Sequence, residues 1–266
     1  MLKDVSESGD VMNKVKLEGL FFDTNNFGQV KVIEYTNNMK VLVEFVKSEY
    51  RTTTSLCNIQ KGNVKDRLQP SVCNVGVIGV GVKTKVNSVK LYEYTLWVGM
   101  LRRCYDSETQ EHQTTYRGCS VSENFKYYPY FYNWCNNQIG FNSVDDKGKP
   151  FSLDKDILTK GNKIYSEDNC VFVPQEINNL LLSNNKIRGK FPIGVSFHKG
   201  VGKFAANINK SRNPIHIGYF TTQEEAFLAY KNAKESYIKE AANKWKDDID
   251  SRVYEALINY QVEITD

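Results

Sequence analysis

The sequence contains no apolar run of the ~20 residues that a membrane-spanning helix needs. Its first seven residues, Met1 to Glu7, are too polar and too acidic for a secretory leader, which begins with a basic segment followed by an apolar one. These two absences argue against a membrane or secreted protein. We therefore expect a cytoplasmic protein with no membrane partner.

Several common site motifs are missing as well. The six cysteines include no CxxC pair and no zinc-ligand spacing, so we interpret them as buried thiols, with metal binding by a subset as the lesser alternative. The glycines from Gly76 to Gly81 match neither GxGxxG nor the P-loop, which indicates strand punctuation rather than a phosphate loop. The chain has only three histidines, His112, His198 and His216.

Acidic residues are absent between Lys186 and Gln223, although the whole chain of 266 residues has a formal net charge of only +4. The basicity is therefore local, as in a module that binds a polyanion. The basic residues of this stretch are Lys186, Arg188, Lys190, Lys199, Lys203, Lys210 and Arg212.

This basic stretch has the pattern of three strands and a helix. Alternation in the middle strand places Lys203, Ala205, Asn207 and Asn209 on one face and apolar side chains on the other. The expected strands are 194–198, 203–209 and 215–220, separated by turns at 199–202 and 211–214. A capping box at Thr222 and Glu225 opens the helix. Its apolar stripe is Ala226, Tyr230, Ala233, Tyr237 and Ala241, which we expect to cover the sheet.

The residues 194–195, 202–208, 217–222, 224–226 and 229–230 together resemble the plant ethylene-response-factor (Apetala-type) DNA-binding domain. The resemblance covers roughly the last quarter of the chain and implies a sheet that lies in the major groove of double-stranded DNA. Similar domains occur at the C-termini of phage HNH homing endonucleases. The alternative is a basic, solvated sheet of unrelated purpose. The expected DNA-binding residues are Arg188, Lys190, Ser196, His198, Lys199, Lys203, Asn207, Lys210 and Arg212.

The N-terminal third has the pattern of a small β unit. Strands at 30–35 and 40–45, joined by the turn 36–39, predict a hairpin. A further strand over 50–57 would allow the sheet to curl into a Tudor-like barrel. Such barrels have many functions, so the fold leaves the function of this part open.

The middle of the chain contains an aromatic segment, 125–134. Its aromatic residues Phe125, Tyr128, Phe131 and Trp134 recur every three residues, which favours one packed helical face, although aromatic patches also stack nucleic-acid bases.

The segment that follows combines a strand at 153–158, a loop at 161–166, a strand at 169–174 and a helix at 175–182. It resembles the ββα core of phage HNH endonucleases, whose activity uses Mg²⁺ or a similar divalent cation and a histidine as general base. Carried over by position, Asp154 and Asn169 would be metal ligands and Asn162 would shape the loop. The histidine position falls on Lys155 or Asp156, which become the candidate catalytic residues.

The lack of a histidine at Lys155 or Asp156 argues against cleavage. A protonated lysine neither binds metal nor accepts a proton readily. The alternative is that Asp154 and Asp156 simply lie on an ordinary solvated face of a strand.

The sequence thus predicts an α+β, multidomain protein with a small β barrel (1–88), an HNH-like ββα core (89–184) and an Apetala-type domain with a C-terminal helix (185–266). We expect a sequence-specific DNA-binding protein derived from a phage homing endonuclease, deficient in cleavage and acting like a repressor. The alternatives are an active divalent-metal-dependent endonuclease and, more weakly, an interaction module that works through the barrel. A homodimer is left open.

Overall fold

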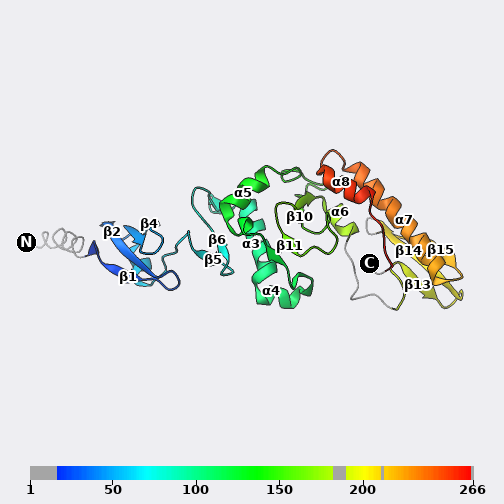
Figure 1. Ribbon diagram of the computed structural model, residues 1–266, viewed down its shortest axis with the longest axis horizontal. Helices are drawn as coiled ribbons and strands as arrows, with labels where there is room; N and C mark the ends of the chain where they lie inside the picture. The colour runs from blue at the N-terminus through cyan, green and yellow to red at the C-terminus, as the bar shows by residue number, and fades with distance from the viewer. Residues whose placement is uncertain (1–16, 182–189, 211–212, 265–266) are drawn as a thin grey trace, which may run out of the picture. The chain divides into compact units, whose positions relative to one another are not determined.

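The computed structural model describes residues 17–181, 190–210 and 213–264 (Figure 1). The chain divides into two compact units. Unit 1 contains the described residues up to Thr115 together with Glu123–Tyr132, and unit 2 contains Tyr116–Ser122 and the described residues from Asn133 onward. Helices and several small sheets make up the structure, which confirms the α+β class. The finer division into three domains stays a prediction.

Unit 1 begins with a four-stranded antiparallel sheet in the order β1-β2-β3-β4. Its strands are β1 (Phe21–Asp23), β2 (Gln29–Asn37), β3 (Lys40–Phe45) and β4 (Arg51–Thr54). The hairpin predicted from alternation is confirmed as β2 and β3. One face is apolar and packs a core made of Phe27, Val30, Val32, Tyr35, Val41, Val43, Phe45, Ile59 and Val64.

The predicted barrel is wrong. Among the described residues this sheet is open, with β1 and β4 as its two edges. The strand predicted over 50–57 ends at Thr54, because Ser55 caps a short helix, α2 (Leu56–Gln60), by accepting a hydrogen bond from the backbone N–H of Asn58. The chain therefore turns away before β4 can extend toward β1.

The remainder of unit 1 packs around α3 (Tyr92–Tyr105). The indole Nε1 of Trp97 donates to the carbonyl of Phe125 at 2.7 Å, and the rings of Phe125 and Phe131 meet edge to face with centroids 5.1 Å apart. Phe125, Tyr128 and Phe131 are fully buried, so the core-packing interpretation of the aromatic segment is confirmed for them. The other elements here are β5 (Pro70–Val72), β6 (Gly76–Val77), β7 (Lys85–Val86), β8 (Val89–Lys90), α4 (Ser107–His112), the 3-10 helix Asn124–Lys126 and the start of α5 (Tyr128–Asn136).

Unit 2 contains two small sheets ahead of the basic stretch. Strand β10 (Ser152–Asp154) pairs antiparallel with β12 (Val171–Val173), and β9 (Ser120–Val121) pairs parallel with β11 (Ile164–Tyr165). Helix α6 (Gln175–Leu180) follows β12 directly. A 3-10 helix, Thr114–Tyr116, lies at the boundary of the two units.

The predicted strands and helix of the basic stretch are confirmed. Strands β13 (Val195–His198), β14 (Lys203–Lys210) and β15 (Asn213–Phe220) form an antiparallel sheet in that order. Helix α7 (Gln223–Lys244) lies along one face of the sheet, and α8 (Ser251–Ile258) packs against α7 (Figure 1).

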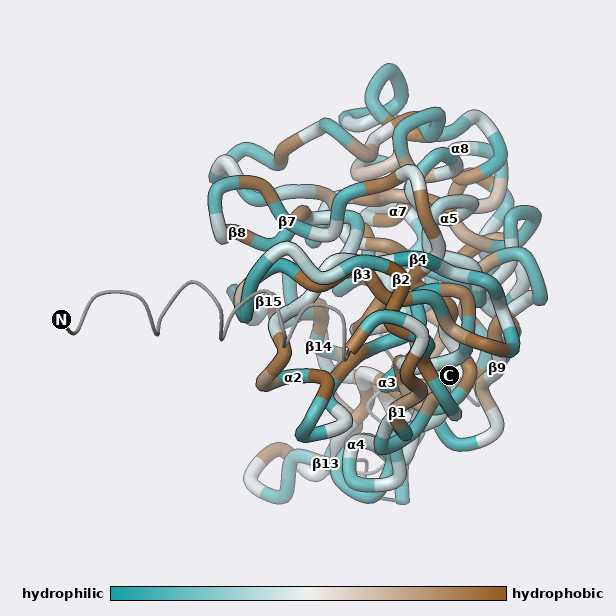
Figure 2. The backbone as a smooth tube through the Cα atoms, turned by 90° about the vertical axis from the view of Figure 1, so that its left-hand side faces the viewer, coloured by the Kyte–Doolittle hydropathy of each residue, from teal (hydrophilic) through white to brown (hydrophobic). Residues whose placement is uncertain are grey.

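Hydrophobic segments along the chain are short and alternate with hydrophilic ones (Figure 2). Within the described residues, none of the helices combines the length and the apolar character that crossing a membrane requires. Cys104, Cys119, Cys135 and Cys170 are buried as expected, whereas Cys57 is exposed.

Candidate nucleic-acid interface

The inner face of the sheet β13-β14-β15 is fixed against α7. Ala226, Tyr230, Tyr237 and Ala241 of the predicted stripe are buried. The ring of Tyr230 lies so close to Gly194 that a Cβ at this glycine would come within 2.0 Å of it. Gly194 also has a φ of +74°, a conformation that glycine adopts most readily. The residue before β13 therefore has to be glycine for the sheet to approach the helix.

The start of α7 has the predicted capping box. The hydroxyl of Thr222 accepts from the backbone N–H of Glu225 at 3.2 Å, and the Glu225 carboxylate accepts from the backbone N–H groups of Thr221 at 3.0 Å and Thr222 at 3.2 Å. This arrangement fixes the direction in which the chain leaves β15.

The outer face of the sheet is exposed and free of carboxylates. Strand register places Ser196 opposite Ala205, and His198 opposite Lys203. On the other side of β14, Tyr219 is opposite Ala205 and His216 is opposite Asn207. The exposed residues of this outer face are Ser196, His198, Lys203, Asn207, Asn209, His216 and Tyr219.

Three rings form a cluster on this outer face. The centroids of His198 and Tyr219 are 5.4 Å apart, and those of His216 and Tyr219 are 4.5 Å apart. His198 comes from β13 and Tyr219 from β15, so their rings meet across the intervening strand β14. Ala205, which we expected to be exposed, is only 4% exposed beneath them. A small residue on β14 is what allows the two rings to meet.

A β-bulge brings His216 and Tyr219 to the same face. Ala206 pairs with Gly218 and Asn207 pairs with His216, so Ile217 has no partner in the ladder. Residues three apart lie on opposite faces of a regular strand, and the extra residue reverses that relation. Strict alternation therefore could not identify His216 and Tyr219 as neighbours, and neither was among the predicted DNA-binding residues.

The side chain of Asn207 is held by His216. Nδ1 of His216 lies 3.0 Å from Oδ1 of Asn207, a hydrogen bond in which the imidazole donates and the amide oxygen accepts. This bond leaves the amide nitrogen of Asn207 free to donate a hydrogen bond from the outer face of the sheet. The pair is a hydrogen-bonding group on an otherwise basic and aromatic surface.

The predicted DNA-binding residues do not all lie on the outer face. Lys210 has the register of the inner face, where its ammonium forms an ion pair with Glu240 of α7 and lies 4.9 Å from the centroid of the Tyr237 ring. The hydrogen bond to Glu240 raises the pKa of Lys210. Its charge is therefore paired within the chain, and its role in DNA binding stays a prediction.

The other basic residues are placed as follows. Lys203 is exposed on the outer face and Lys199 is exposed in the turn before it. The ammonium of Lys190 lies 5.3 Å from the ring centroid of Phe191. Arg188 and Arg212 lie outside the described residues.

The segment that resembles an HNH core contains β10, β12 and α6 in the expected order. The first strand is shorter than expected, because it ends at Asp154, and the expected loop contains β11. Asp154 ends β10, opposite Val171 of β12, and α6 follows. The Asp154 carboxylate accepts from the backbone N–H groups of Asp156 and Ile157, both at 2.9 Å. Burial raises the pKa of the Asp154 carboxyl, and the neighbouring Asp156 carboxylate raises it further.

Lys155 is buried and makes its contacts within its own loop. Its side chain is buried, with Nζ 3.0 Å from the Asp156 carboxylate and donating to the Asn162 carbonyl at 2.7 Å. The amide of Asn162 donates in turn to the carbonyls of Lys155 at 2.6 Å and Ile164 at 2.8 Å. Asn162 therefore shapes this loop, as the resemblance implied, and Lys155 holds it closed.

The expected metal ligands are not joined by these contacts. The Asn169 amide donates to the Ser166 hydroxyl at 3.0 Å, and no hydrogen bond in the described part of the chain links it to Asp154. Nor do three His, Cys, Asp or Glu side chains converge on a cation position anywhere among the described residues. Asp154 and Asn169 stay predicted metal ligands, and we derive no catalytic step from them.

No family model, curated protein or solved structure matches this chain.

Proposed function

We propose that the chain is a sequence-specific double-stranded DNA-binding protein that places the outer face of β13-β14-β15 in the major groove. The observation that carries the proposal is this exposed face, which combines Lys203, the ring cluster and the Asn207–His216 pair with no carboxylate. Sheets and two-stranded ribbons can enter the major groove, where each base pair presents a distinct set of donors and acceptors.

Two kinds of contact are combined in this proposal. Lys199, in the turn after β13, and Lys203, the first residue of β14, are exposed cations that bind phosphates, which gives affinity that does not depend on sequence. The Asn207 amide and the imidazole of His216 present hydrogen-bonding groups to base edges, which gives specificity.

We further propose that the protein derives from a phage homing endonuclease, does not cleave, and acts like a repressor by occupying its site. The support is the environment of Lys155, which is buried and fixed in a loop at the position where the resemblance requires a general base. A protein that keeps a long, specific footprint without cutting blocks access of other proteins to the DNA.

The second candidate function is an active, divalent-metal-dependent endonuclease. One observation favours it: β10, β12 and α6 follow one another as in a ββα core, with the Asp154 and Asp156 carboxyls adjacent.

The experiment is selection from a random duplex library with the full chain, followed by incubation of the selected duplex with Mg²⁺ or Mn²⁺. Recovery of one sequence that is bound and stays intact supports the proposal. Site-specific cleavage would establish the endonuclease instead. Recovery of no preferred sequence would contradict sequence-specific binding.

A further inference from the structure

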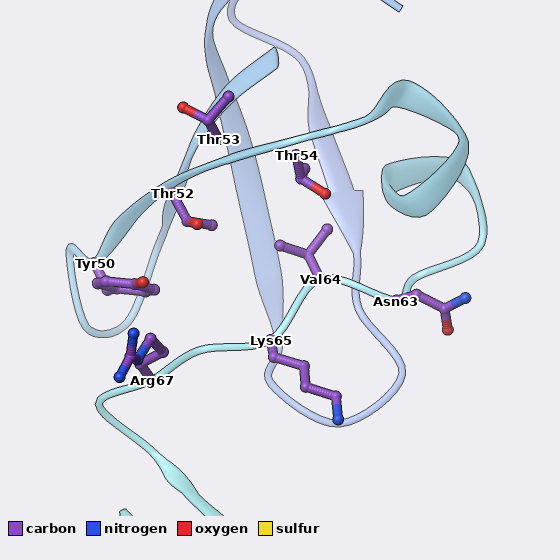
Figure 3. A pocket seen from close by; sticks show the side chains of 8 residues that line it. All are labelled: Tyr50, Thr52, Thr53, Thr54, Asn63, Val64, Lys65 and Arg67. Atoms are coloured by element: carbon purple, nitrogen blue, oxygen red, sulfur yellow. The ribbon is translucent and has the colours of Figure 1, made fainter. Parts of the chain in front are cut away.

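Unit 1 has a groove of ≈ 260 Å³ beside the edge strand β4 (Figure 3). The chain leaves β4, forms α2 and returns as the segment 63–67, which runs along the free edge of β4. Val64 is buried in the core of the sheet, and the backbone N–H of Asn63 donates to the carbonyl of Asn58 at 2.8 Å. Both walls of the groove are therefore built into the fold.

The groove is lined by hydrogen-bond donors and cations. Thr52 and Thr54 lie on the same side of β4, toward the returning segment, whereas Thr53 lies on the opposite side (Figure 3). Lys65 and Arg67 are the two cations of the lining. The Lys65 side chain extends away from Thr52 and Thr54 (Figure 3), so its ammonium would have to turn toward a bound anion. Nη2 of Arg67 donates to the Val82 carbonyl at 3.0 Å, which fixes the guanidinium. Such a fixed fork of N–H groups is suited to oxyanions.

The carboxylate that lies between the two cations in the sequence is engaged elsewhere. Asp66 lies between Lys65 and Arg67 in sequence but is only 1% exposed, and it accepts from the Ser48 hydroxyl, the backbone N–H of Leu68 and the amide of Gln69. No Asp or Glu lines the groove. The cations of the groove are therefore not neutralised from within it.

We infer that this groove binds a phosphate group of a phosphate ester. An oxyanion matches both the charges and the hydroxyl donors, and the volume leaves room for part of the molecule that carries the phosphate. Addition of a peptide strand to β4 is disfavoured, because the segment 63–67 already runs beside that edge. The inference concerns unit 1 and does not rest on the function proposed for the sheet of unit 2.

The test uses the full chain labelled with ¹⁵N-threonine and titrated with inorganic phosphate, with sodium chloride at matched ionic strength as the control titration. We expect saturable amide shifts at Thr52 and Thr54 with phosphate alone. The variant Lys65→Gln/Thr54→Val should weaken phosphate binding at least tenfold, with Thr52 as the reporter. Lys40→Gln, a charge-matched change at the tip of the β2-β3 hairpin and outside the groove, should not.

Two further titrations distinguish the source of the phosphate. A nucleoside 5′-monophosphate represents small esters, and a random-sequence duplex, added to the Lys203→Gln chain to reduce binding through unit 2, represents the nucleic-acid backbone. Saturable shifts at Thr52 and Thr54 with either ligand support the inference and identify its class. Absence of saturable shifts with all three phosphate ligands would overturn it, as would equal binding by the Lys65→Gln/Thr54→Val variant or shifts produced only by a neutral β-strand peptide.

Discussion

Nδ1 of His216 lies 3.0 Å from Oδ1 of Asn207, opposite it in the register of β14 and β15. One lone pair of the amide oxygen is thus occupied, and the amide nitrogen remains the outward donor. An asparagine that reads adenine uses both its oxygen and its nitrogen, so this bond changes what Asn207 offers to a base. It favours reading of an acceptor, such as a purine N7, through the nitrogen.

The first prediction separates these two residues. Asn207→Ala should weaken binding to the selected duplex by about 1 to 3 kcal/mol, roughly 5- to 150-fold, and leave binding to random DNA unchanged. His216→Phe keeps a ring beside Tyr219 but removes the hydrogen bond, so it should mainly reduce the ratio of specific to random affinity. Fluorescence anisotropy on both duplexes measures this. Equal losses on the two duplexes would contradict a role in base reading.

The second prediction compares two lysines of the same strand. Lys203 is exposed on the outer face and forms no ion pair within the described residues, whereas Lys210 is paired with Glu240 on the helix side. Lys203→Gln should therefore reduce the slope of log affinity against log salt by about 0.9, the loss of one phosphate contact. Lys210→Gln is the matched control and should leave the slope unchanged. Equal slopes for the two variants would place the interface elsewhere.

Part of this fold follows from local sequence rules. Alternation along β14 and the capping residues Thr222 and Glu225 identified a strand and the start of a helix, because both signals depend only on neighbours in the chain. The ion pair of Lys210 could not be predicted in this way. Its counterion, Glu240, lies thirty residues later, and no local pattern indicates that α7 brings this carboxylate to the sheet.

The candidate site was predictable only in part. The bulge at Ile217 depends on pairing with β14, so the cluster of His198, His216 and Tyr219 appears only once the sheet is assembled. Likewise, closure of the N-terminal sheet depends on where β4 ends, and Ser55 sets that end by capping α2.

The third prediction concerns how β13 approaches α7. Gly194→Ala places a Cβ against the Tyr230 ring at a positive φ, and we expect a loss of about 2 to 3 kcal/mol in the free energy of unfolding. Gly202→Ala is the control, because Gly202 also has a positive φ but nothing within 4 Å of the added Cβ. It should cost about 1 kcal/mol. Urea unfolding of both variants measures the difference, and equal losses would show that the contact with Tyr230 contributes nothing.

The fourth prediction tests whether Lys155 is structural. Lys155→Met removes the bonds to the Asp156 carboxylate and the Asn162 carbonyl while keeping a long apolar side chain. We expect a loss of about 1 to 3 kcal/mol in stability, since the partly buried carbonyl loses its donor. Affinity for the selected duplex should be unchanged. Unaltered stability together with the loss of an existing cleavage activity would instead identify Lys155 as catalytic.

The fifth prediction uses the pKa of Asp154, which burial and the adjacent Asp156 carboxylate raise above its ordinary value. Folding therefore favours the protonated carboxyl. The stability contributed by this group is fully present below the ordinary pKa of aspartate, about 3.9, and is lost as the pH rises through the raised value in the folded chain.

Asp154→Asn is the matched test, because the amide keeps an oxygen that can accept from the backbone N–H groups of Asp156 and Ile157 but carries no charge. Urea unfolding of both proteins between about pH 3.5 and 7.5 measures the difference. The variant should gain stability relative to the natural chain as the pH rises through this window, and the two should converge at its acid end.

Asp145→Asn is the control with the opposite sign. The backbone hydrogen bond from Lys149 lowers the pKa of Asp145, so the natural residue should be favoured as the pH rises. A difference for Asp154→Asn that stays constant with pH would show that Asp154 is ionised as readily in the folded chain as in the unfolded one.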